Sequence, residues 1–180
     1  AMLADHPRHA AVLKLAADKA GWGEALVHVD GKRRGRGVAL HESFRSYVAQ
    51  VVDVSVEDDG SYSVDRVVCA VDCGVAVNPD VVKAQMEGGI GFALAAALYG
   101  EITIEDGVVQ QSNYHDYQVL RMPQMPVVEV HIMPSAQAPS GVGEPGVPPL
   151  APALANALYS ATGKRLRDLP LGPKVAVYNG

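Results

Sequence analysis

YVAQVVDVSVEDDGSYSVDRVVCAVD, residues 47–72, is the stretch that decides the fold. Valines alternate along one face of its first part, which is the pattern of a strand with one side buried (Val48, Val52, Val54 and Val56). Glu57-Asp58-Asp59-Gly60 is a turn signal, and a second valine-rich strand is predicted from Tyr62 to Asp72. Two strands joined by a tight turn run antiparallel, so the stretch predicts a β-hairpin.

Further elements extend this hairpin on both sides. Strands are predicted over residues 37–42 and 127–133, and a short hairpin over 102–109 turns at Glu105-Asp106-Gly107. Helices are predicted over residues 8–20, 79–99 and 151–161, with Gly21, Gly100 and Gly163 at their ends. Tight turns between strand pairs favour an α+β fold over a parallel doubly wound one. We expect a two-layer domain over 1–180, with a mainly antiparallel sheet and helices packed on it.

Residues 23–37 are polar and rich in glycine, which predicts a loop. Lys32-Arg33-Arg34 and Arg36 form a local basic group within it. A solvated loop, or a loop that contacts a phosphate-bearing ligand, explains this group better than a nucleic-acid site, because the formal net charge of the chain is −5. No nucleic-acid partner is expected.

The composition limits the other classes of function. The chain has two cysteines, Cys69 and Cys73, which are too few for a disulfide framework or a four-thiolate metal site and are expected to be small buried residues. The six histidines show no metal-binding spacing, so no protein-ligated metal is expected (His6, His9, His28, His41, His115 and His131). No apolar run reaches the roughly 18 residues of a membrane span, and no signal peptide is recognisable.

The loop Gly141-Val142-Gly143-Glu144-Pro145-Gly146 isolates one carboxylate between glycines and a proline. Glycine permits close approaches, and Pro145 favours an extended conformation at Glu144. A glutamate just ahead of a helix N-terminus lies in a field that favours its ionised form, as a general base requires. On local composition alone, a surface turn that happens to contain a glutamate is the favoured interpretation.

Two further segments are candidates for a site. Asn78-Pro79 is a good start for a helix that carries Gln85 and Glu87 and retains Gly88, Gly89 and Gly91. Each such glycine costs a helix about 0.5–1 kcal/mol, which suggests close packing against a ligand or another backbone. Simple packing of the helix on the sheet explains them as well. The polar cluster Ser112–Tyr117 includes His115-Asp116, although adjacent side chains in an extended segment point apart.

Several motifs in this order resemble the large subunit of the molybdenum hydroxylases, the xanthine dehydrogenase and aldehyde oxidase family. They are residues 71–79 (VDCGVAVNP), 85–89 (QMEGG) and 141–146 (GVGEPG). Residues 6–9, 21–23, 41–44 and 112–117 are similar to the branch of isoquinoline 1-oxidoreductase beta subunits and related aldehyde dehydrogenases. The resemblance covers essentially the whole chain and implies a C-terminal cofactor-binding domain, a fragment of a larger subunit.

The resemblance implies specific roles. Glu144 matches the catalytic base of an enzyme that hydroxylates an N-heteroaromatic compound or an aldehyde with oxygen from water. Gln85 matches the glutamine that reaches the phosphate region of the cofactor, and Gly88, Gly89 and Gly143 match positions beside it. The implied cofactor is molybdopterin cytosine dinucleotide, whose dithiolene holds the molybdenum in the full-length subunit. The fragment alone is expected to lack cofactor and activity.

The resemblance also implies partners: the upstream part of the large subunit, a small iron–sulfur subunit and, as a candidate electron acceptor, a cytochrome c. It leaves the compartment open between cytoplasm and a periplasmic or membrane-associated site. One departure is that many members have a second glutamine followed by Gly-Leu-Gly, where this chain has Ile90-Gly91-Phe92-Ala93-Leu94. The alternative from another class is a stand-alone, non-catalytic interaction or regulatory module with the same fold.

Overall fold

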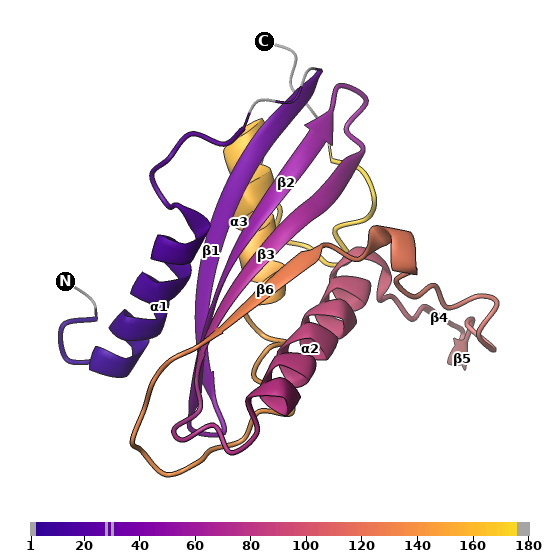
Figure 1. Ribbon diagram of the computed structural model, residues 1–180. Helices are drawn as coiled ribbons and strands as arrows, with labels where there is room; N and C mark the ends of the chain where they lie inside the picture. Colours follow the sequence, from indigo (N-terminus) through magenta and orange to yellow (C-terminus); the bar gives the residue numbers. More distant parts are fainter. Residues whose placement is uncertain (1–2, 28, 30, 176–180) are drawn as a thin grey trace.

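The computed structural model describes residues 3–27, 29 and 31–175. Its main sheet has the order β1-β2-β3-β6, with β1 at Lys32–Ser43, β2 at Ser46–Glu57, β3 at Tyr62–Asp72 and β6 at Val127–Ile132 (Figure 1). The first three strands are antiparallel neighbours, as the hairpin pattern of residues 47–72 predicts. β6 pairs with β3 in parallel, because the chain crosses over through a helix before it returns to the sheet.

Three helices begin and end close to the predicted positions: α1 at Pro7–Ala20, α2 at Pro79–Tyr99 and α3 at Leu150–Thr162. The side chain of Asn78 caps α2 by accepting hydrogen bonds from the backbone N–H groups of Asp80 and Val81, at 3.1 and 3.2 Å. Gly21 ends α1 with a positive φ of 66°, a conformation that glycine adopts without strain.

The predicted class, α+β with a mainly antiparallel sheet, is confirmed. Helices cover both faces, however, so the sheet is the middle of three layers rather than one of two. One face packs against α2 and α3 through the larger core, which includes Val52 and Leu154. The other face packs against α1 through a smaller core. The physical reason is that β2 and β3 are apolar on both faces: Ala49, Val51, Val68 and Ala70 point toward α1.

The prediction of a loop over residues 23–37 is wrong for its second part, because β1 begins at Lys32. The basic residues there pair across the sheet: the guanidinium of Arg36 holds the carboxylate of Asp53 with N–O distances of 2.6 and 2.8 Å. Gly35 and Gly37 are in a strand that α3 crosses closely. A Cβ added at Gly37 would lie 2.2 Å from the carbonyl oxygen of Ala153. These glycines therefore permit packing of a helix on a strand and do not signal a loop.

α2 is long and apolar enough to cross a membrane by length and composition alone, with 21 residues and a mean hydropathy of 1.2. This differs from the sequence-based expectation. Met86, Ile90 and Leu94 on its inner face are fully buried in the larger core, so α2 is a core helix of this domain.

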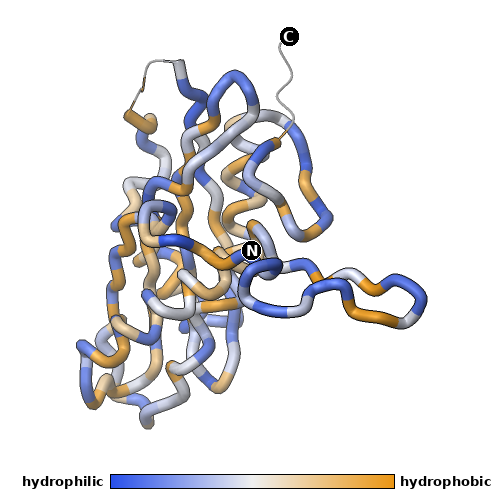
Figure 2. Tube along the Cα trace, turned by 90° about the vertical axis from the view of Figure 1, so that its right-hand side faces the viewer, coloured by the Kyte–Doolittle hydropathy of each residue, from blue (hydrophilic) through white to orange (hydrophobic). Residues whose placement is uncertain are grey.

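An arm formed by residues 101–119 leaves the body after α2 and returns through the short 3-10 helix η1 at Met122–Gln124. It contains a two-strand hairpin, β4 at Ile104–Glu105 and β5 at Val108–Val109, at the predicted position. All of its residues except Gln111 are exposed. Figure 2 shows the arm extending away from the rest of the molecule, with apolar residues along it.

Candidate functional site

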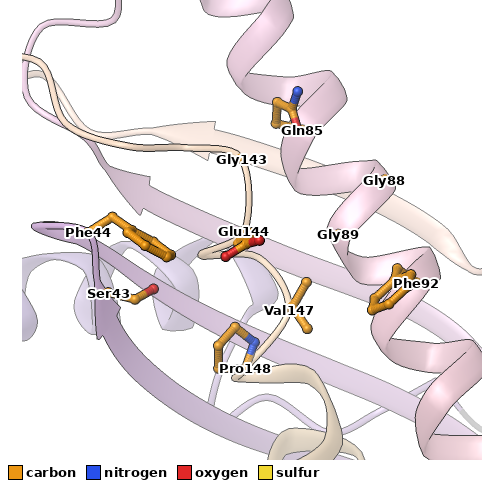
Figure 3. Close-up of a pocket in the computed structure, with 10 residues that line it drawn as sticks. All are labelled: Ser43, Phe44, Gln85, Gly88, Gly89, Phe92, Gly143, Glu144, Val147 and Pro148. Atoms are coloured by element: carbon orange, nitrogen blue, oxygen red, sulfur yellow. The ribbon is translucent and has the colours of Figure 1, made fainter. Parts of the chain in front are cut away.

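Three separate segments line an open surface cavity of about 460 Å³. They are the end of β1 with the turn that follows it, the outer face of α2, and the loop before α3 (Figure 3). The cavity contains every predicted site residue (Gln85, Gly88, Gly89, Gly143 and Glu144) together with Ser43, Phe44, Phe92, Val147 and Pro148. Residues that are distant in the sequence therefore meet at one place.

Glu144 lies at the centre of this arrangement, on a loop between the turn that carries Phe44 and helix α2 (Figure 3). Its carbonyl oxygen accepts a hydrogen bond from the N–H of Val147 at 2.9 Å, which closes a tight turn. This turn separates Glu144 from α3, whose N-cap is Pro149. The side chain is exposed and accessible to a ligand in the cavity.

Helix α2 contributes a hydrogen-bonding side chain and open space to the cavity. Gln85 is exposed and brings a carboxamide, which both donates and accepts hydrogen bonds. A Cβ added at Gly88 would meet no atom within 4 Å in the part of the chain that the structure describes, the helix's own backbone aside, and the same holds for Gly143. At Gly89 the added atom would lie 3.5 Å from Gly146, an ordinary van der Waals distance, so the loop lies directly against the helix here.

The turn between β1 and β2 forms one side of the cavity, and the sequence motifs did not assign its residues to the site. Phe44 and Arg45 have φ values of 53° and 63°, in the left-handed region that non-glycine residues rarely adopt. Such strain is often found at functional sites. The hydroxyl of Ser43 is buried and has no hydrogen-bond partner among the described residues. The sequence offered a partial signal: residues 41–44 belong to a matched motif and fall between two predicted strands, but the motif gives Ser43 and Phe44 no role.

The polar cluster at residues 112–117 is not part of this cavity, because it lies in the exposed arm. Asp116 accepts hydrogen bonds from the backbone N–H groups of Asn113 and Ser112 and from the Ser112 hydroxyl, and these bonds lower its pKa to about 2. The segment is a turn, so His115 and Asp116 do not point apart as an extended segment would require. Their side chains are 3.6 Å apart. The cluster stabilises the arm locally.

The two cysteines are buried on the same face of the sheet region, as predicted. Burial raises the pKa of the Cys69 thiol to about 12, which keeps it protonated and unreactive. No group of three or more His, Cys, Asp or Glu side chains could hold a metal ion within residues 3–27, 29 and 31–175. His28 lies outside these residues.

Asp72 fixes the chain where β3 leaves the sheet toward α2. Its carboxylate accepts two hydrogen bonds of 2.7 Å from Arg8 on α1 and one of 3.1 Å from the N–H of Gly74. The Arg8 guanidinium holds the pKa of this carboxyl below its usual value. The contact joins α1 to the segment that leads into α2, and so supports the helix that carries Gln85.

Comparison with known proteins identifies relatives of this arrangement. The profile of the molybdopterin cofactor-binding domain matches residues 11–126. The beta subunit of the isoquinoline 1-oxidoreductase of Brevundimonas diminuta is 41% identical over 179 residues, which cover 94% of this chain and 22% of that protein. The putative molybdenum-binding subunit of a xanthine dehydrogenase from Escherichia coli K12 is 33% identical over 136 residues, covering 72% and 18%. The chain thus spans about a fifth of the length of these relatives.

Solved structures agree with the sequence relatives. The aldehyde oxidoreductase from Desulfovibrio desulfuricans has 29% identity and a TM-score of 0.59, over 71% of this chain and 15% of that one. The quinoline 2-oxidoreductase from Pseudomonas putida 86 has a TM-score of 0.66 over 71% of this chain and 18% of that one; at 20% identity it supports the fold alone. The family profile covers more than half of the residues, and this chain therefore belongs to the molybdopterin cofactor-binding domain family.

Proposed function

We propose that this chain is the C-terminal part of the large subunit of a molybdenum hydroxylase, which hydroxylates an N-heteroaromatic compound or an aldehyde with oxygen from water. The observation that carries this proposal is the meeting of Gln85, Gly88, Gly143 and Glu144 in one cavity. These residues come from two segments more than fifty positions apart. They are the positions that the resemblance to the family assigns to the cofactor and the base.

Two features of the cavity support the binding of part of a phosphate-bearing cofactor, which we propose to be molybdopterin cytosine dinucleotide. Gly88 and Gly143 leave room that any side chain would fill. The amide of Gln85 can donate a hydrogen bond to a phosphate oxygen. The bound cofactor would supply the molybdenum, held by its own dithiolene, and with it the two-electron oxidation.

Glu144 is proposed to act as the general base. Its carboxylate is accessible from the cavity and would accept a proton at an Oε atom. Phe44, Phe92 and Val147 line the cavity around it with apolar surface. These side chains would exclude water from the carboxylate when a ligand is bound, which strengthens the electrostatic interactions of the charge.

The partners proposed for this domain are the remaining part of the large subunit, a small iron–sulfur subunit and a cytochrome c as electron acceptor. The chain spans about a fifth of the length of its relatives, which supports the remaining part of the large subunit as a partner. The relatives are described as subunits, which supports a separate iron–sulfur subunit. The chain itself contains two cysteines, both buried in its core, whereas an iron–sulfur cluster requires four ligands.

Substitution of Glu144 by glutamine in the complete enzyme tests the proposal. The variant keeps the size of the side chain but cannot accept the proton, so turnover should fall by about 10²–10⁴-fold. Molybdenum and pterin content should stay unchanged. Glu87→Gln is the matched control, because Glu87 is an exposed glutamate on α2 outside this cavity. Turnover near that of the unchanged enzyme would remove Glu144 from the mechanism.

A further inference from the structure

Gln50 is a polar residue in an otherwise apolar position. It lies in the middle of β2, is fully buried, and shares its face of the sheet with Val48, Val52 and Val54. Burying an amide costs free energy unless it forms hydrogen bonds, and a valine at this position would fill the core without that cost. The presence of glutamine at this place therefore requires an explanation.

The amide of Gln50 makes one strong contact. Its Nε2 donates a hydrogen bond of 2.7 Å to the carbonyl oxygen of Gly146, and this bond is buried. Gly146 is the last residue of the loop that carries Glu144. It also packs on α2: a Cβ added there would lie 3.2 Å from the carbonyl oxygen of Met86, next to Gln85. The bond thus fixes the loop where it contacts both the sheet and α2.

The other end of the loop is anchored by the turn between β1 and β2. The hydroxyl of Ser46 donates to the carbonyl oxygen of Gly141 at 2.6 Å, and the N–H of Gly141 donates to the carbonyl oxygen of Phe44 at 3.3 Å. Between the two anchors, Gly143 has open space on its side-chain side among the described residues. The position of Glu144 therefore depends on the bonds at Gly141 and Gly146.

We propose that Gln50 is a positioning residue for Glu144: its hydrogen bond to Gly146 holds the loop so that the carboxylate faces the cavity. This inference rests on the proposed role of Glu144 as base. A carboxamide suits the task because it donates a hydrogen bond without a charge. An ionised glutamate at the same place could only accept, and would repel the carbonyl oxygen of Gly146.

The test is Gln50→Leu in the complete, cofactor-loaded enzyme. Leucine fills a similar volume but cannot donate a hydrogen bond. A displacement of about 1 Å can cost a factor of about 100 in rate, so kcat should fall by about that factor while KM and cofactor content remain unchanged. Val54→Ala is the matched control: Val54 is fully buried on the same face of β2 but pairs with Gly35 and Val64, away from the loop. It should lower stability and leave kcat within about twofold.

Two measurements distinguish a positioning role of Gln50 from a general loss of stability. Adding Gln50→Leu to Glu144→Gln should cause no further loss of kcat, because a residue that acts through Glu144 has no effect once the base is gone. Independently of activity, the amide of Val147, which donates to Glu144, should exchange its hydrogen faster in Gln50→Leu but not in Val54→Ala.

Equal losses in Gln50→Leu and Val54→Ala, or unchanged exchange at Val147, would overturn the inference. Full activity of Glu144→Gln would instead contradict the proposed function. In that case the exchange at Val147 still decides whether Gln50 holds the loop, so the two failures are distinguishable.

Discussion

The glycines near the cavity have different functions, which become visible at the scale of single residues. Gly88 and Gly143 face open space, whereas Gly146 lets the loop approach α2 closely. Gly89 lies against Gly146, and Gly91 lies against the sulfur of Met125. The sequence motif alone indicates only that all of these glycines lie close to a ligand or to another part of the backbone. We infer that Gly88 and Gly143 leave room for the ligand, and that Gly146 lets the loop and α2 come together to form the cavity.

Gly88→Leu tests this distinction. The new side chain would occupy the cavity without contacting the core, so the helix should keep its stability or gain some. We expect the complete enzyme to lose most of its molybdenum and pterin, measured by elemental analysis and pterin fluorescence. Glu87→Leu is the control, because its side chain lies on α2 outside this cavity. A full cofactor content in Gly88→Leu would show that the cofactor does not use this space.

The residues of the site were predictable to different degrees. Gln85 and Glu144 follow from ordered motifs, because the chemistry of each needs a particular side chain at a particular spacing. Ser43 and Phe44 could not be assigned in the same way. Their place in the cavity depends on how the turn after β1 meets the loop before α3, and these segments are almost a hundred residues apart in the chain.

At the scale of elements, the contact between β1 and α3 shows why the local interpretation of glycine failed. Residues 32–37 have the composition of a loop, but Gly35 and Gly37 are needed because backbone atoms of α3 lie where their side chains would be. A long-range contact therefore decides the local structure. The hairpin of β2 and β3, and the limits of α2, were predictable because a turn signal and a helix cap are local features.

Gly37→Ala should consequently be costly. Its Cβ would lie 2.2 Å from backbone atoms of Ala153 and Ala157, which cannot move without shifting α3. We expect a loss of about 1–3 kcal/mol in the free energy of unfolding, the usual cost of overpacking. Urea denaturation measures it. Gly88→Ala, made in a helix with open space, should instead add about 0.5–1 kcal/mol. An unchanged midpoint for Gly37→Ala would mean that the strand and helix are not held this closely.

At the scale of the whole molecule, the site is an open surface. Phe44 and Phe92, on opposite sides of Glu144, are 60% and 71% exposed. The arm also presents large apolar side chains to solvent, among them Ile102, Ile104 and Val108. Binding sites for cofactors and other small molecules bury most of the surface of their ligand. One domain with a shallow cavity contributes part of such a site, which agrees with the proposal that further chain of the large subunit completes it.

The isolated 180-residue chain is therefore expected to fold without retaining the cofactor. The sheet and three helices have continuous cores of their own, so circular dichroism should show mixed helix and strand with a cooperative thermal transition. Elemental analysis should find no stoichiometric molybdenum, and pterin fluorescence should be absent, because an open cavity cannot enclose a dinucleotide cofactor. The complete large subunit, produced in the same cells, should contain both. Stoichiometric cofactor on the isolated chain would contradict the division of the site between this domain and the rest of the large subunit, since the three segments around Glu144 would then suffice for binding.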